Sequence, residues 1–277
     1  MFRLAIVLLF VSVALNAQDM NEICKKGLKV YYANEEVSKK ENEATQELNA
    51  KNNVLYSTQR VLKKGFDDKE MARIQEDIER LKKNIADYER YISEYKAKLS
   101  GQEELVELSK LNKDDQNKKL GEIDKEIDAI RSKLSEIRKP FREERRKNES
   151  IVSGDEKTFD EFFKKQFKTS TTLGIDKVSC NPGLSSAFSS VSWYQGDKQV
   201  LWAHIRMRAL PEIPQNPKML FNKYYASSIS GSSIWYWAGH FQIAFVSSDK
   251  SFKDENKLQE AIKELIDSEA LAAVKAQ

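Results

Sequence analysis

The chain has few of the residues that most often build catalytic or metal-binding sites. Its 277 residues include only two histidines and two cysteines. It contains no G-x-S-x-G or H-E-x-x-H motif, and neither histidine has a carboxylate at ligand spacing beside it. We therefore expect no catalytic residue, no metal site and no cofactor, and we predict that the protein is not an enzyme.

Cysteine is scarce enough to limit covalent cross-linking to one bond. Cys24 and Cys180 are the only two cysteines, and an even number permits one disulfide in an oxidising compartment. Such a bond would tie the amino-terminal segment to the carboxy-terminal domain. Long helices between the two cysteines could instead hold them apart, so both states remain open.

Only one long apolar run occurs, from Leu4 to Leu15. Its 12 residues fall short of the roughly 20 that a membrane-spanning helix needs. An arginine precedes the run and Leu15-Asn16-Ala17 follows it, which is typical of a cleaved secretory signal. We expect residues 1–17 to be removed and the mature protein to be exported, either periplasmic or extracellular, without a stable membrane span.

The chain also lacks a marked excess of charge of one sign. Its 46 Lys and Arg residues nearly balance 43 Asp and Glu residues. This balance is typical of a well-solvated surface and not of a field that attracts nucleic acid. We expect no nucleic-acid partner.

Proline is absent from the first half, and aromatic chemistry is concentrated in the second. No proline precedes Pro140, whereas all the tryptophans and histidines lie between Trp193 and His240. This shift predicts a boundary near residue 150. We predict a cleaved signal (1–17), an amino-terminal segment with Cys24 (18–32), a coiled coil (33–150) and an α+β domain (151–277).

What the first half does contain is a strict apolar repeat. Apolar residues follow at alternating steps of three and four from Met71 to Leu99, through Tyr88 and Tyr95, and again from Leu120 to Phe141. This spacing lays a continuous seam along one side of a helix. It predicts a long α-helical coiled coil, built either as a helical hairpin or as a rod.

Breaks in this repeat indicate where helices end. Gly65, followed by Asp67 and Glu70, predicts the end of a helix over 33–64 and the capped start of the next. Further on, the phase retained across the polar stretch 112–119 favours one unbroken helix, whereas Ser100-Gly101 favours a break. Both alternatives remain open, as does pairing within one chain or between chains.

A basic cluster follows near the end of the last predicted helix. It comprises Arg138, Lys139, Arg142, Arg145, Arg146 and Lys147. Such a cluster could dock on an acidic surface or an anionic glycan. Neighbouring glutamates dilute it, and positive charge suits the carboxyl end of a helix, so we favour a solvated helix end.

The second half predicts a small α+β domain with an antiparallel sheet. A helix capped by Thr158 presents Phe159 and Phe163 on one face. Strands over 186–195 and 198–209 are joined by the turn residues Gly196 and Asp197. A proline-rich loop, one or two further strands with a turn at Ser230-Gly231, and a closing helix over 254–274 complete the prediction.

The stretch SSIWYWAGHFQIAFV, residues 232–246, is the richest in aromatic residues. Taken as one strand, its alternation places Trp235 and Trp237 with Phe241 in the core. Its opposite face and the outward face of strand 198–209 then form one surface that could bind a carbohydrate, a peptide terminus or an acidic partner. The predicted binding residues are Trp202, His204, Arg206, Arg208, Tyr236, His240 and Gln242.

These features favour an exported, noncatalytic structural or adaptor protein. Its coiled coil would set spacing or self-associate, and its carboxy-terminal domain would make the specific contact with a protein partner. The alternative is a holdase-like chaperone whose helical arms clasp unfolded exported proteins. A third hypothesis places an enzyme in the carboxy-terminal domain, with turnover that depends on His204 or His240.

Overall fold

The chain folds into two compact units. The computed structural model describes residues 2–87, 92–209, 218–220, 223–227, 233–247, 249, 252 and 254–274. Met1–Glu35 and Arg145–Gln277 form one unit, the sheet unit, and Glu36–Glu144 form the other, the helical unit. Long packed helices followed by an antiparallel sheet with short helices confirm the predicted fold class.

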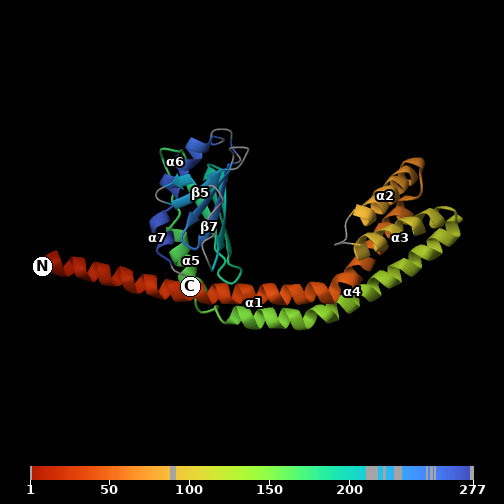
Figure 1. The fold of residues 1–277 in the computed structure, drawn as a ribbon, viewed down its shortest axis with the longest axis horizontal. Coiled ribbons are helices and arrows are strands. Elements are labelled where there is room, and N and C mark those ends of the chain that lie inside the picture. Colours follow the sequence, from red (N-terminus) through yellow and green to blue (C-terminus); the bar gives the residue numbers. More distant parts are fainter. Residues whose placement is uncertain are drawn as a thin grey trace. The chain divides into compact units, whose positions relative to one another are not determined.

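Four helices make up most of the first 150 residues. They are α1 (Phe2–Lys64), α2 (Asp68–Asp87), α3 (Ile92–Ser109) and α4 (Lys113–Ser150), as Figure 1 shows. Because no proline interrupts the early sequence, α1 runs through the predicted segment 18–32 without a break. The predicted start of this helix at residue 33 is therefore wrong.

The predicted bend after α1 is confirmed. Gly65 adopts a left-handed conformation with φ of 92°, which favours glycine. The Asp67 carboxylate then accepts a hydrogen bond from the Glu70 backbone N–H at 2.7 Å. This side chain caps the first turn of α2 and satisfies a donor that the helix itself leaves unpaired.

The second break lies where neither alternative placed it. Helix α3 continues through Ser100 and Gly101, and the chain breaks instead just before Lys113. Asn112 caps α4 by accepting from the Asp115 N–H at 2.9 Å. The Gln116 side-chain amide also closes the turn by donating to the Leu108 and Leu111 carbonyls at 3.2 and 3.0 Å.

The repeat is used within the chain, as a helical hairpin. Ile74 and Ile78 of α2 contact Leu105 of α3, so the seam predicted along one helix is divided between two. Tyr88, which was predicted on that seam, lies outside the described residues. A second cluster joins α1, α3 and α4 through Leu55, Leu62, Leu108, Ile123, Ile127, Ile130 and Leu134.

A seven-stranded antiparallel sheet forms the centre of the sheet unit, in the order β1-β2-β3-β7-β6-β5-β4. Its strands are β1 (Lys177–Asn181), β2 (Phe188–Gln195), β3 (Lys198–Met207), β4 (Lys218–Leu220), β5 (Lys223–Ser227), β6 (Ser233–Ala238) and β7 (Phe241–Ser247). The predicted hairpin at Gly196, with φ of 58°, is confirmed. The loop 210–217 and the turn predicted at Ser230-Gly231 lie outside the described residues.

The aromatic stretch 232–246 is a hairpin and not one strand. Gly239, with φ of 59°, and His240 form a two-residue turn between β6 and β7. Such a turn pairs Ala238 with Phe241 and Trp237 with Gln242, so odd positions of β6 share a face with even positions of β7. The prediction that the two tryptophans share the core face with Phe241 is therefore wrong.

Three short helices cover one face of the sheet. They are α5 (Glu156–Lys165), α6 (Glu255–Leu265) and α7 (Ser268–Ala272), and Figure 1 shows them on one side of the strands. Their apolar residues join a core with Val191, Trp193 and Ile205 of the sheet. Met20, Ile23, Cys24, Leu28 and Val30 of α1 belong to the same core.

Two helix boundaries differ from the prediction. Asp155, and not Thr158, occupies the position before α5. The predicted closing helix is divided, because Ile266 bridges to Phe167 and the Asp267 N–H donates to the Gln166 carbonyl at 2.8 Å. This local pairing takes backbone groups out of the helix, which resumes after Asp267 as α7.

The disulfide considered from the sequence is not formed in this structure. Cys24 and Cys180 are both free thiols. Cys24 is fully buried in the core of the sheet unit, and Cys180, in β1, packs against the same core.

Candidate binding face of the sheet

The second face of the sheet carries a different set of side chains from the core face. Along β2 and β3, buried core residues alternate with half-buried or exposed residues. Pairing extends this second set to β1, β6 and β7. We call it the outer face; its described side chains are Lys177, Ser179, Asn181, Phe188, Ser190, Ser192, Trp202, His204, Arg206, Ser233, Trp235, Trp237, Gln242, Ala244 and Val246.

Some of the predicted binding residues come together on this face. Trp202, His204 and Arg206 follow one another at alternate positions of β3, and the last two are exposed. Gln242 is buried and pairs in register with Arg206 on one side and Trp237 on the other.

The other predicted residues lie elsewhere. His240 lies in the turn between β6 and β7, where it is buried and its Nδ1 lies 2.7 Å from the Arg208 carbonyl oxygen. The Arg208 N–H donates in return to the His240 carbonyl at 2.8 Å, just beyond β3. The Tyr236 backbone pairs with Ile243, and its side chain lies outside the described part of the structure.

An aromatic row crosses the outer face. The rings of Trp202 and His204 are 4.5 Å apart, and the ring of Phe188 lies 5.0 Å from His204. The Arg206 guanidinium lies 6.0 Å from the centre of the Phe188 ring, within the range of a cation–π contact. Phe188 was not predicted as a binding residue. Alternation along β2 nevertheless places its side chain on the face of the strand that the core residue Val191 does not occupy.

The β6 tryptophans extend this surface. Trp235 is 42% exposed and pairs with Ala244, which in turn pairs with His204. Trp237 is only 9% exposed, yet its indole N–H has no acceptor among the described residues. Burying a donor without an acceptor costs on the order of 1–3 kcal/mol.

The described side chains of the outer face carry no negative charge. Arg206 of β3 and Lys177 of β1 are its charged residues, and no Asp or Glu among the described residues lies within ion-pair distance of the Arg206 guanidinium. Ser190, Ser192 and Gln242 add neutral hydrogen-bonding groups. The face is therefore aromatic, polar and positively charged.

A small cavity adjoins the Phe188 end of the aromatic row. Its volume is about 190 Å³, and it is lined by Tyr31, Ser186, Ala187, Phe188, Arg206, Met207 and Arg208. Tyr31 comes from α1 and the other lining residues come from the sheet and the loop before β2. Ala187 has a φ of 50°, a left-handed conformation that non-glycine residues rarely adopt.

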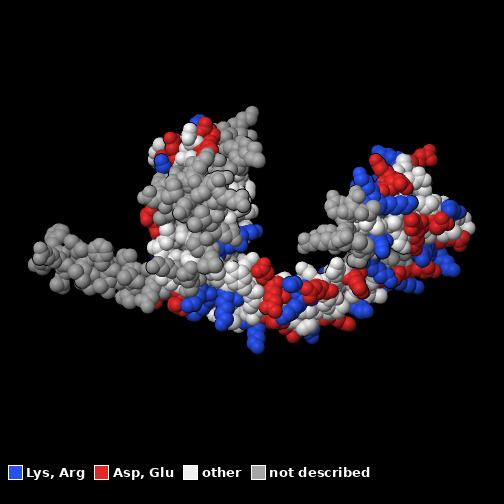
Figure 2. All heavy atoms as spheres, in the orientation of Figure 1, with Lys and Arg blue, Asp and Glu red and all other residues white. Residues whose placement is uncertain are grey.

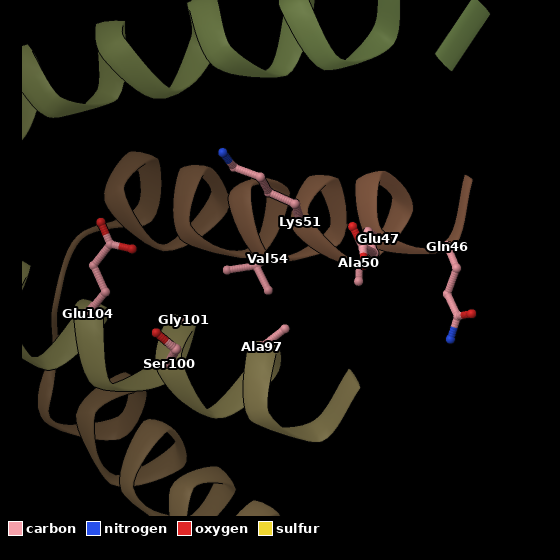
Figure 3. Close-up of a pocket in the computed structure, with 9 residues that line it drawn as sticks. All are labelled: Gln46, Glu47, Ala50, Lys51, Val54, Ala97, Ser100, Gly101 and Glu104. Atoms are coloured by element: carbon pink, nitrogen blue, oxygen red, sulfur yellow. The ribbon is translucent and has the colours of Figure 1, made fainter. Parts of the chain in front are cut away.

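A larger hollow lies inside the helical unit. It has a volume of about 420 Å³ and is lined by Gln46, Glu47, Ala50, Lys51, Val54, Ala97, Ser100, Gly101 and Glu104. Figure 3 shows Ala50 and Val54 of α1 facing Ala97 of α3. Ala50, Val54 and Ala97 form its apolar floor, and the charged residues Glu47, Lys51 and Glu104 also line it.

The basic cluster near the end of α4 is partly engaged through Arg138 and Arg142, which belong to the helical unit. Arg138 lies 3.5 Å from the Glu41 carboxylate and donates to the Asn49 side chain at 3.0 Å. Arg142 donates to the Ser135 carbonyl at 3.1 Å, close to Pro140. Figure 2 shows Lys and Arg interspersed with Asp and Glu over the helices.

The described residues contain neither a cluster of metal ligands nor a helix suited to span a membrane. In the ranges given above, no three His, Cys, Asp or Glu side chains come close enough together to hold a metal ion. Across those same ranges, no helix is both long enough and apolar enough to cross a membrane.

No protein-family model, no curated protein and no solved structure matches this chain.

Proposed function

We propose that the protein is an exported, noncatalytic adaptor whose outer face binds a protein partner. Export is proposed from the signal predicted for residues 1–17, and the helical unit provides spacing or a surface for assembly. The observation that carries the proposal is the aromatic and basic outer face, on which Trp235 remains 42% exposed.

The composition of this face suits protein recognition. Tryptophan and arginine are enriched among the residues that contribute most to protein interfaces. Contiguous aromatic residues that stay in contact with water often mark such interfaces. Trp202, His204 and Phe188 are held in mutual contact on a hydrogen-bonded sheet, so little side-chain freedom is lost on binding.

The test is a comparison of partners captured from the envelope of the producing cells. The double variant Trp202→Ser/Trp235→Ser removes two outer-face tryptophans, and Ile151→Ser removes an exposed apolar side chain outside that face as a control. We expect one partner to be lost from the double variant, retained by the control, and bound again when it is purified. Equal capture by a correctly folded double variant would refute the proposal.

The hollow in the helical unit favours a second candidate, a holdase-like chaperone. Its apolar floor at Ala50, Val54 and Ala97 could receive apolar side chains of an unfolded client. In this case the full chain suppresses the aggregation of reduced insulin, and Ala97→Lys abolishes the effect. Ala129→Lys, on the exposed surface of α4, is the matched control. Aggregation unaffected by the wild-type chain removes this candidate.

A further inference from the structure

The cavity beside Phe188 brings together residues that are far apart in sequence. Tyr31 of α1, Ser186 of the loop before β2, and Arg206 and Arg208 of β3 and its extension all line the same space of about 190 Å³. All of these residues belong to the sheet unit. The cavity is therefore a feature of one compact body.

Its charge is positive and its arginines are well positioned. Arg206 and Arg208 both line the cavity, and none of its seven lining residues is acidic. The Arg208 backbone N–H donates to the His240 carbonyl, and the Arg208 carbonyl oxygen lies 2.7 Å from the His240 Nδ1. The Arg208 Nη2 donates to the Gln242 Oε1 at 3.4 Å. Arg206 rests on the Phe188 ring, which holds its planar group without neutralising it.

We propose that this cavity binds the carboxylate of an acidic side chain in a peptide segment of the partner. This deepens the proposed function and rests on it. A guanidinium matches a carboxylate through two parallel N–H donors, a geometry that a lysine ammonium does not offer. The rings of Tyr31 and Phe188 provide apolar walls for the methylene groups that carry the carboxylate.

The size of the cavity favours a side chain over a whole small molecule. Pockets that enclose a small-molecule ligand usually have volumes of about 300–1,000 Å³. The 190 Å³ found here suits a single end group that enters from a longer chain. The aromatic row starts at Phe188, so neighbouring residues of the same peptide would lie against His204 and Trp202.

The test measures the binding of a fluorescein-labelled hexaglutamate peptide to the full mature chain by fluorescence anisotropy at low salt. A hexaglutamine peptide is the neutral probe, and a galacturonate oligosaccharide is the glycan probe. Arg206→Gln removes the cavity guanidinium. Lys177→Gln is the matched control, because it removes one positive charge from β1 that also lies over an aromatic ring, that of Tyr194.

We expect hexaglutamate to bind and hexaglutamine not to bind. We also expect Arg206→Gln to raise the dissociation constant about tenfold or more, since hydrogen bonds to charged groups contribute about 1.5–3 kcal/mol. Lys177→Gln should change it by less than about twofold, because exposed single charges contribute little. Near-ultraviolet circular dichroism confirms that each variant is folded.

Three outcomes overturn the assignment. They are no binding of hexaglutamate, equal weakening by the two variants, and binding of galacturonate in place of hexaglutamate. If the partner is still lost from the Trp202→Ser/Trp235→Ser variant in any of these cases, the adaptor proposal stands and only the carboxylate cavity is removed.

Discussion

At the scale of single residues, the two thiols differ in how far they are shielded from water. Cys24 is 0% exposed in the core, and burial raises its pKa to about 12. Cys180 lies half-buried in β1, and burial raises its pKa to about 11. Only the thiolate is a good nucleophile, so we expect both cysteines to react slowly in the folded protein.

We predict that iodoacetamide at pH 8 modifies Cys180 slowly and leaves Cys24 unmodified until the protein unfolds. Mass spectrometry of proteolytic peptides measures each site, and a sample unfolded in guanidinium chloride gives the reference rate. Modification of Cys24 as fast as Cys180 in the native protein would show that α1 separates from the core on that timescale.

Two glycines in the helical unit provide a matched pair with opposite expected effects. A Cβ added at Gly101 of α3 would overlap Val54 Cγ1 of α1, whereas one added at Gly121 of α4 meets no atom within 4 Å. We predict that Gly101→Ala lowers the free energy of unfolding by about 1–3 kcal/mol through overpacking. Gly121→Ala should raise it by up to about 1 kcal/mol through helix propensity.

Urea unfolding followed by circular dichroism at 222 nm measures both effects. Stabilisation by Gly101→Ala would mean that Val54 rotates away without cost and that α1 and α3 do not need a glycine to approach each other.

At the scale of elements, the bend between α1 and α2 depends on a buried carboxylate. The Glu70 carboxylate accepts from the Lys64 ammonium at 2.8 Å and also bonds to Arg73. The hydrogen bond from Lys64, with the positive charge of Arg73, lowers the pKa of Glu70 despite its burial. A lowered pKa in the folded state means that the ionised carboxylate stabilises the fold.

We predict that this contribution is fully present above the ordinary glutamate pKa of about 4.3 and is lost as pH falls through the lower pKa of the folded state. Glu70→Gln should reduce stability at pH 7 and flatten the pH dependence in the acidic range. Glu79→Gln, at an exposed position of α2, is the control. An unchanged pH profile in Glu70→Gln would show that the bend does not depend on this carboxylate.

The sequence predicted elements better where a repeat or a cap specifies them than where a turn is closed by side chains. Gly65 predicts the end of α1 and Asp67 predicts the start of α2, and the structure confirms both boundaries. The break before Lys113 is closed by Gln116, whose amide reaches back to two carbonyls, and no local signal reveals such a bond. These bonds between a side chain and nearby backbone, and not the heptad phase, mark where the helix breaks.

The composition of the outer face was predicted in part for a similar reason. Alternation correctly placed Trp202, His204 and Arg206 together because β3 is one uninterrupted strand. It misplaced Trp235 because Gly239-His240 is a two-residue turn that exchanges the faces. Tyr31 could not be predicted from local pattern at all, since it reaches the cavity from α1, more than 150 residues before Phe188.

At the scale of the whole molecule, the sheet unit is built from two distant stretches of chain. Residues of α1 between Met20 and Val30 share a core with residues after Glu144. At Gly27, α1 comes very close to the segment that contains Leu184. A Cβ added at Gly27 would overlap Leu184 Cδ1 and lie 2.8 Å from the Leu184 carbonyl oxygen. A backbone atom cannot move aside as easily as a side chain, so this contact requires glycine.

We predict that Gly27→Ala destabilises the sheet unit by about 1–3 kcal/mol. Hydrogen exchange measured by mass spectrometry should show faster exchange in β2 and β3, with little change in the core of the helical unit. Gly154→Ala is the control, because a Cβ added there meets no atom within 4 Å. Unchanged exchange in β2 and β3 would argue against α1 as part of this core.

The discontinuous core also sets an order of events during biogenesis. Val274 lies in the same core as Met20, so about 250 residues of chain must be present before that core can close. Contacts of such long sequence separation form late, because loop closure must precede them. The amino-terminal residues of the core therefore remain uncovered while the rest of the chain is made, and the export proposed above would use this unfolded interval.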